Sequence, residues 1–283
     1  MKVPRGAQGH ALRRGVERPT APFMWLAAVC LLALGLASCS ASSAGGAIQT
    51  RGGEPGRPVV VRLFGDSLTW ESQAVLEARL GAGFDLRVTT FGGIAPCDLA
   101  DEIIATAEAD EADVLLLQMS GNAVSPCMHP SNRPLSDTER LDKYRADVLS
   151  IIEETSSTGI PLVLVGTPPM PPQRNQSPDA VYRELAELSA SRDRPVSYLD
   201  AGAAVAGPAG AWTATLPCLP FESDRMGCTG GQIAVRAADQ VHFCPGSLGE
   251  SNGTIVACDR WSSGAWRYGA AIAADLRDRY PPG

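Results

Sequence analysis

A serine, a histidine and an aspartate in this sequence have the types and positions that acyl-transfer chemistry requires. Ser67 comes shortly after the apolar run Val59–Phe64 and the glycine Gly65, where a buried strand is expected to end in a tight turn. Asp239 and His242 are three positions apart, so a single turn of the chain can hold a carboxylate against an imidazole. Together these side chains predict a nucleophile that is activated by an oriented general base.

Each of these residues also has an ordinary structural interpretation. A polar residue after a strand often caps the next helix, and an isolated histidine is more often packed or exposed than catalytic. The chain has only three histidines, and His10 lies in an N-terminal segment that has the features of an export signal. His129 has no carboxylate at a useful spacing. His242 is therefore the candidate base.

Two further segments carry groups that can donate a hydrogen bond to a negatively charged oxygen. The stretch Phe91–Asp98 contains two adjacent glycines, and a glycine at a turn after a strand frees its backbone N–H to point into a cleft. Asn122 follows the buried run Val114–Leu117, and its side-chain amide is a donor of the kind that an oxyanion hole needs. The alternative for both segments is a simple turn.

In four segments, which occur in the same order, the chain resembles the SGNH, or GDSL, hydrolases. Phe64-Gly65-Asp66-Ser67-Leu68 is similar to the nucleophile motif of that family, and Asp239-Gln240-Val241-His242 is similar to its Asp-x-x-His block. The resemblance implies that Ser67, Asp239 and His242 form a catalytic triad. It also implies that no metal and no cofactor take part.

The same resemblance assigns the oxyanion hole. Gly93 matches the oxyanion glycine of the family, with Gly92 as the alternative, and Asn122 matches the oxyanion asparagine. The family more often has Gly-x-Asn-Asp at the last position, whereas here Gly121 directly precedes the asparagine and Ala123 follows it. The loop around Asn122 is therefore expected to depart from the usual geometry.

Apolar segments alternate with amphipathic segments from Val59 onward, and this predicts βαβ units. We expect a three-layer α/β/α fold around a doubly wound parallel sheet of five strands in flavodoxin-like order. The expected strands are 59–64, 86–90, 114–117, 161–165 and 196–199. The expected helices are 70–80, 99–108, 138–154, 181–190 and 265–279. Glycine and cysteine are frequent between residues 202 and 263, which predicts an irregular, cross-linked region.

The N-terminal part of the chain predicts export and a lipid anchor. Residues 1–38 have a basic start, a short apolar core and small residues at its end, as secretory signals do. Leu36-Ala37-Ser38-Cys39 resembles the bacterial lipobox, so Cys39 is expected to be lipidated. Residues 39–57 are rich in Ser, Gly and Ala and predict a flexible tether to a hydrolase domain at 58–283. A plain signal peptide and an uncleaved anchor are the alternatives.

Charge and cysteine content limit the partners. The formal net charge is −7 and no basic run is present, so nucleic-acid binding is not expected. Two of the eight cysteines, Cys30 and Cys39, lie in the export segment, and an exported protein favours disulfides among the other six. The expected disulfides are Cys97–Cys127, Cys218–Cys228 and Cys244–Cys258. A metal site that uses His242 and Cys244 is the alternative, although the spacing matches no zinc signature.

These features predict a monomeric serine esterase that is anchored to the cell membrane on the extracytoplasmic side. Its substrate is a small-molecule, lipid or glycan ester that the sequence does not identify. Two alternatives remain open at this stage. One is a transferase that passes an acyl or acetyl group to an envelope glycan, and the other is a non-catalytic binding lipoprotein with the same fold.

Overall fold

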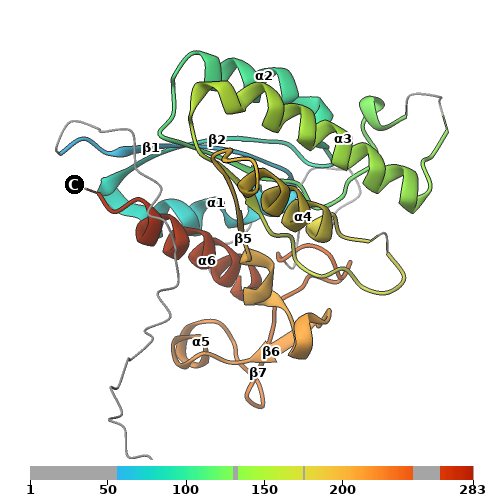
Figure 1. The fold of residues 1–283 in the computed structure, drawn as a ribbon. Helices are drawn as coiled ribbons and strands as arrows, with labels where there is room; N and C mark the ends of the chain where they lie inside the picture. Colours follow the sequence, from blue (N-terminus) through green and yellow to red (C-terminus); the bar gives the residue numbers. More distant parts are fainter. Residues whose placement is uncertain (1–55, 130–132, 175, 245–261, 283) are drawn as a thin grey trace, which may run out of the picture. The chain divides into compact units, whose positions relative to one another are not determined.

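The computed structural model describes residues 56–129, 133–174, 176–244 and 262–282. A five-stranded parallel sheet with the order β2-β1-β3-β4-β5 forms its centre, so the predicted three-layer α/β/α fold with flavodoxin-like order is confirmed (Figure 1). The strands are β1 (Val59–Gly65), β2 (Phe84–Thr90), β3 (Val114–Gln118), β4 (Leu162–Val165) and β5 (Val196–Leu199). All five predicted strands are present.

Helices cover both faces of the sheet (Figure 1). They are α1 (Ser67–Leu80), α2 (Pro96–Glu108), α3 (Asp137–Thr155), α4 (Asp179–Ala190) and α6 (Ser263–Arg279). Strand side chains alternate between the two faces: in β3, Leu115 and Leu117 pack with α2, α3 and α4, whereas Val114 and Leu116 pack with α1 and α6. Every residue of β3 and of β4 is buried, because a parallel sheet is covered on both faces.

Four helices, α1, α2, α4 and α6, begin two to three residues earlier than the apolar spacing predicts. Helix α1 begins at Ser67, since the Asp66 side chain caps it by accepting a hydrogen bond from the Leu68 N–H at 3.0 Å. Helix α2 begins at Pro96, whose fixed φ suits the first helical position. Helix α4 begins at Asp179. Caps and first turns carry no apolar period, so sequence spacing does not show them.

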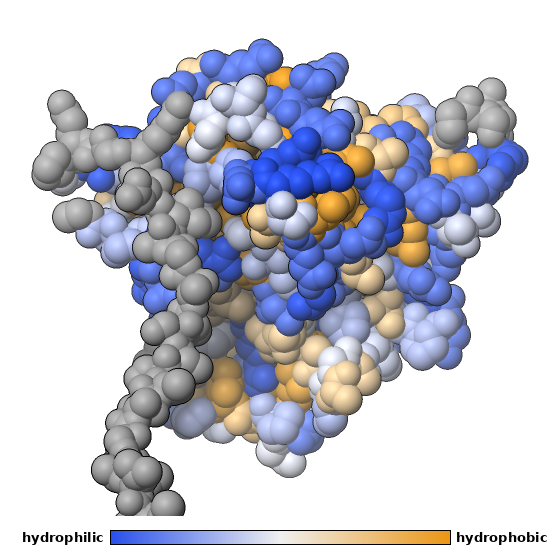
Figure 2. Space-filling model, viewed as in Figure 1, coloured by the Kyte–Doolittle hydropathy of each residue, from blue (hydrophilic) through white to orange (hydrophobic). Residues whose placement is uncertain are grey.

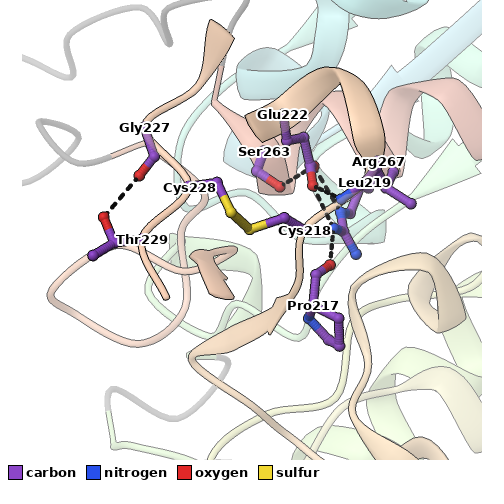
Figure 3. The surroundings of a disulfide bond; sticks show 9 residues. All are labelled: Pro217, Cys218, Leu219, Glu222, Gly227, Cys228, Thr229, Ser263 and Arg267. Atoms are coloured by element: carbon purple, nitrogen blue, oxygen red, sulfur yellow. Dashed lines mark hydrogen bonds and ion pairs between the residues drawn. A yellow bond between two sulfur atoms is a disulfide. The ribbon is translucent and has the colours of Figure 1, made fainter. Parts of the chain in front are cut away.

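The region 202–262 is more ordered than predicted where the structure describes it. It contains a short antiparallel pair, β6 (Thr215–Pro217) and β7 (Gln232–Ala234), and a short helix α5 (Pro220–Arg225). The expected Cys218–Cys228 disulfide joins the segments on either side of α5 (Figure 3). Elements of three to six residues are too short to produce a sequence period.

A buried ion pair fastens this region to the domain. The Arg267 guanidinium of α6 donates to the fully buried Glu222 carboxylate of α5, with Nη2–Oε2 at 2.6 Å (Figure 3). Ser263 Oγ donates to the same carboxylate at 2.6 Å, and Arg267 also donates to the Pro217 carbonyl at 2.7 Å. The short elements are therefore held in place by polar contacts to α6 as well as by the disulfide.

On the face drawn in Figure 2, hydrophilic residues predominate and hydrophobic residues lie among them in small groups. In the described ranges, no helix combines the length and hydropathy needed to cross a bilayer. The predicted signal 1–38, the predicted lipidation site Cys39 and the predicted tether up to residue 55 lie outside the described residues. Arg57, at the end of that tether, pairs with Asp113, with Nη1–Oδ2 at 2.7 Å.

Candidate active site

Ser67, His242 and Asp239 form one hydrogen-bonded row at the carboxyl end of the sheet. Ser67 is the first residue of α1, directly after β1 and its Asp66 cap, and its Oγ lies 2.8 Å from His242 Nε2. His242 Nδ1 lies 2.5 Å from Asp239 Oδ2. With Nδ1–H donating to the carboxylate, Nε2 is the acceptor that faces the serine hydroxyl. The structure thus brings together the three residues that the sequence predicts as nucleophile, base and orienting acid.

The three-residue spacing of Asp239 and His242 forms a single tight turn. Asp239 Oδ1 accepts hydrogen bonds from the backbone N–H groups of Val241 and His242, both at 3.0 Å. Gln240 between them has a φ of 69°. Its carbonyl accepts a hydrogen bond from Trp212 Nε1 at 2.9 Å. One oxygen of Asp239 therefore fixes the turn, while the other faces the imidazole.

A second contact ties the histidine loop to the helix that carries the serine. Glu71 lies one turn after Ser67 in α1, is only 2% exposed, and accepts a hydrogen bond from the Phe243 N–H at 2.7 Å. Phe243 is the residue after His242, so α1 carries the nucleophile and also contacts the loop of the base. The sequence analysis does not identify Glu71. Its only signal is the four-residue spacing from Ser67 on the same helix face.

The electrostatics of the row suit a general base. Burial lowers the pKa of His242, but the hydrogen bond with Asp239 and the charges of Glu71 and Asp239 raise it more, so the pKa lies above 6.5. Burial raises the pKa of Asp239, but hydrogen bonds from the His242 side chain and the Val241 N–H lower it more, so the pKa lies below 3.8. Asp239 therefore stays ionised and stabilises the imidazolium.

Two backbone N–H groups are candidates for binding a developing oxyanion. The Ser67 N–H is at the first position of α1, where no intrahelical acceptor exists and the helix dipole favours negative charge. Gly93 follows β2 with a φ of 81°, and a Cβ there would lie 2.9 Å from the Val124 Cγ2 methyl. Among the described residues, none accepts a hydrogen bond from the Gly93 N–H. Only glycine fits this position without strain.

The Asn122 side chain is held beside the nucleophile by the residue that precedes it. Asp66 is fully buried, and its Oδ2 accepts hydrogen bonds from Asn122 Nδ2 at 2.9 Å, the Ser120 N–H at 2.6 Å and Ser120 Oγ at 2.5 Å. The Asn122 carbonyl accepts a hydrogen bond from the Tyr144 hydroxyl at 2.9 Å. One proton of the Asn122 amide is thus fixed by Asp66, which leaves the second available for an oxyanion.

Asp66 does more than cap the helix that follows the strand. The carboxylate caps α1 through Oδ1 and orients Asn122 and Ser120 through Oδ2. Burial raises the pKa of Asp66, and the hydrogen bonds from Ser120 and Leu68 oppose this shift without cancelling it. The sequence does not predict a role for Ser120. Only Gly121, directly before Asn122, indicates that this loop is unusual.

A buried arginine that the sequence does not indicate links two loops beside Asn122. Arg140 of α3 is 1% exposed and donates to the carbonyls of Gly121 at 3.2 Å and of Gln176 at 2.6 Å. Its guanidinium also lies 3.2 Å from Asp137 Oδ1. The β3–α3 loop, which carries Asn122, is therefore tied to the β4–α4 loop.

A disulfide braces the oxyanion segments, as the sequence predicts. Cys97 at the start of α2 is bonded to Cys127, five residues after Asn122. The two sulfurs and Asp98 are the one cluster of potential metal ligands among the described residues, and a disulfide leaves no thiolate to bind a metal. The predicted Cys244–Cys258 pair lies outside the described residues because Cys258 does.

A cavity of about 180 Å³ opens beside Asn122. It is lined by Ser120, Gly121, Asn122, Met170, Arg174 and Val241. Val241 directly precedes the candidate base and Asn122 is the candidate oxyanion donor, so the cavity lies next to the Ser67–His242 pair. Its size suits a small group attached to a reacting carbonyl rather than a long chain.

Residues 60–247 match the family model described as "Protein of unknown function (DUF459)". No curated protein sequence matches the chain at a significant level.

Solved structures with a similar arrangement include three acyl-ester enzymes. The catalytic domain of Streptococcus pneumoniae peptidoglycan O-acetyltransferase A is 15% identical, with a TM-score of 0.44, over 79% of this chain and 96% of that one. A lipase/acylhydrolase from Enterococcus faecalis is 17% identical, with a TM-score of 0.47, over 80% and 98%. A mutant of an acetylxylan esterase from Geobacillus stearothermophilus is 16% identical, with a TM-score of 0.47, over 80% and 95%.

Proposed function

This chain belongs to the DUF459 family, which is related to the SGNH hydrolases, and we propose that it hydrolyses carboxylic esters with Ser67 as nucleophile. The observation that carries the proposal is the continuous row from Ser67 Oγ to His242 Nε2 at 2.8 Å and from His242 Nδ1 to Asp239 Oδ2 at 2.5 Å. The row stands at the carboxyl end of β1, where open α/β sheets bind their ligands.

In the proposed first step, Ser67 Oγ attacks the ester carbonyl while its proton passes to His242 Nε2. The carbonyl oxygen becomes an oxyanion that accepts hydrogen bonds from the Ser67 and Gly93 N–H groups and from Asn122 Nδ2. Asp239 stabilises the imidazolium. The tetrahedral intermediate then breaks the bond to the alcohol oxygen, which takes the proton from His242 and leaves as the alcohol.

In the second step, a water molecule takes the place of the alcohol. His242 removes a proton from the water, and the hydroxide attacks the acyl carbonyl of the ester formed with Ser67. When that intermediate collapses, Ser67 Oγ leaves and recovers its proton from His242, and the carboxylic acid is released. The same three donors hold the oxyanion in both steps, so no additional group of the protein is required.

The enzyme is proposed to work outside the cytoplasm, held to the cell membrane by a lipid on Cys39. This part of the proposal rests on the sequence alone, namely the signal-like residues 1–38 and the lipobox-like Leu36-Ala37-Ser38-Cys39. Replacing Cys39 by alanine in the full chain is expected to move the protein from the membrane fraction to the soluble exported fraction.

The function is tested with the full chain and short-chain p-nitrophenyl esters. The Ser67→Ala variant is expected to lose at least about a thousandfold in kcat/KM, because the nucleophile is removed while the fold keeps its core. The Ser72→Ala variant, which changes a buried serine of the same helix, is the matched control and should keep most of the activity. Equal rates for wild type and Ser67→Ala contradict the esterase. Activity that appears only with an added sugar acceptor indicates a transferase instead.

A further inference from the structure

We propose that Arg174 binds a carboxylate of the substrate in the cavity beside Asn122, so that the enzyme prefers esters that carry a negative charge near the scissile bond. The inference rests on the proposed ester chemistry and adds a substrate class to it.

Arg174 stands where two cavities meet. The cavity of about 180 Å³ beside Asn122 has Met170 and Arg174 in its wall. A second cavity of about 480 Å³, between the β4–α4 loop and the segment after β5, has the same two residues in its wall. The two cavities therefore adjoin at Met170 and Arg174. A substrate group that extends past Asn122 meets this guanidinium.

Among the described residues, none pairs with the guanidinium of Arg174. Of the lysine and arginine side chains that the structure describes, all but Arg174 and Arg192 contact a carboxylate, a carbonyl, a hydroxyl or an aromatic ring. Arg192 lies between α4 and β5, at the amino end of the sheet and far along the strands from the reactive row. Arg174 is thus the one described basic side chain that is both unpaired and beside the site.

The smaller cavity has no acidic lining residue that could pair with the Arg174 guanidinium. Its other five lining residues are uncharged. In the larger cavity Asp179 and Asp200 both lie near Arg183, at 3.3 and 3.5 Å from its Nη2, so these acids already face a cation. A single guanidinium in a neutral pocket matches a group with one negative charge, and its planar donor pair fits a carboxylate.

The backbone groups of Arg174 and Gln176 have hydrogen-bond partners in neighbouring loops. The Arg174 N–H donates to the Pro171 carbonyl at 2.9 Å, and the Gln176 carbonyl accepts from the buried Arg140 at 2.6 Å. Arg140 also binds the Gly121 carbonyl, next to Asn122. The β4–α4 loop, which carries Arg174, is therefore tied to the β3–α3 loop, which carries Asn122. A carboxylate bound by Arg174 is thus positioned relative to the reacting carbonyl.

The test compares charged and neutral esters with the same reacting group. On the alcohol side, 4-acetoxybenzoate is compared with its neutral methyl ester. On the acyl side, mono-4-nitrophenyl adipate is compared with 4-nitrophenyl hexanoate. Both pairs are measured with wild type, Arg174→Gln, Arg174→Lys and the matched control Arg192→Gln, which removes the other unpaired arginine.

Arg174→Gln is expected to lower kcat/KM about tenfold for the anionic member of one pair, mainly through KM, and to leave the neutral esters within about twofold. Lysine should restore part of the loss, Arg192→Gln should change neither pair, and the preference should weaken at high salt.

Two outcomes overturn the inference, and they differ from each other. If wild type hydrolyses the neutral esters through Ser67 but Arg174→Gln changes both members of each pair equally or neither, the carboxylate site is refuted and the esterase stands. If wild type hydrolyses none of the esters, the proposed function fails and the carboxylate site fails with it.

Discussion

Replacing Asp66 by asparagine should damage catalysis through Asn122 rather than through the nucleophile. The Asp66 carboxylate accepts four hydrogen bonds, from the Leu68 N–H at 3.0 Å through Oδ1, and from the Ser120 N–H, Ser120 Oγ and Asn122 Nδ2 through Oδ2. An asparagine of the same shape has one acceptor oxygen and one NH₂ group. Either the Leu68 N–H or the three donors near Asn122 must then face a donor instead of an acceptor.

The cheaper orientation keeps the oxygen toward Asn122 and turns the new NH₂ toward Leu68. This arrangement leaves one buried N–H unpaired and converts three charge-assisted hydrogen bonds into neutral ones, so we expect a loss of about 2 kcal/mol in the free energy of unfolding. The weaker hold on the Asn122 amide should lower kcat about 10- to 100-fold, less than the 10²–10³-fold expected when Asn122→Ala removes the donor altogether.

A double-mutant cycle, assayed with a short-chain p-nitrophenyl ester, shows whether Asp66 acts by orienting Asn122 or by another route. If Asp66 acts by orienting Asn122, adding Asp66→Asn to Asn122→Ala should change kcat less than about threefold. If the full loss persists in the double variant, Asp66 acts on Ser67 or on the fold, and the reasoning is refuted. Ser120→Ala, which removes one donor to the same oxygen, is the control and should cost less in both kcat and stability.

Three further variants test the base, the oxyanion glycine and the buried ion pair. The kcat/KM of wild type should fall as acid protonates His242, with an apparent pKa above 6.5. Asp239→Asn removes a negative charge that raises the pKa of His242, so the pH–rate profile of this variant should shift to lower pH. Its kcat should also fall at least about a hundredfold. Gly93→Ala places a methyl 2.9 Å from a valine methyl at a φ of 81°, so steady-state kinetics should show a loss in kcat of about tenfold or more; wild-type kcat would contradict the oxyanion role. Glu222→Gln weakens the buried ion pair with Arg267, so urea denaturation should show a loss of about 2–4 kcal/mol in the free energy of unfolding. An unchanged urea midpoint would refute the stabilising role of this ion pair.

The sheet was predictable because its central strands, β3 and β4, are buried on both faces. Runs such as 114–117 and 162–165 consist of apolar residues alone, and a parallel sheet covered by helices leaves no other place for them. Helix ends and the short elements between residues 202 and 262 were less predictable. They depend on single capping side chains and on contacts to distant residues, such as that of Glu222 to Arg267, which leave no local pattern.

The candidate site divides in the same way. Ser67, Asp239 and His242 were predicted because chemistry restricts their types and because the turn between the last two is local in sequence. Glu71 and Arg140 were not predicted, since each is a charged residue on an amphipathic helix, and such residues usually face solvent. Their roles depend on the backbone groups that the fold brings to them, namely the Phe243 N–H and the carbonyls of two loops.

The position of His242 is set by the residue that follows it rather than by the contact with Ser67. These two residues are 175 positions apart, and one hydrogen bond of about 1 kcal/mol cannot hold such a closure by itself. Phe243 is 2% exposed, packs with its ring centroid 5.4 Å from that of Tyr268 in α6, and donates its N–H to Glu71 in α1. The contacts of Phe243 with α1 and α6 thus fix the chain directly after His242. The fold therefore does not depend on the hydrogen bond between Ser67 and His242, and this bond can break and form again without moving the loop that carries the histidine.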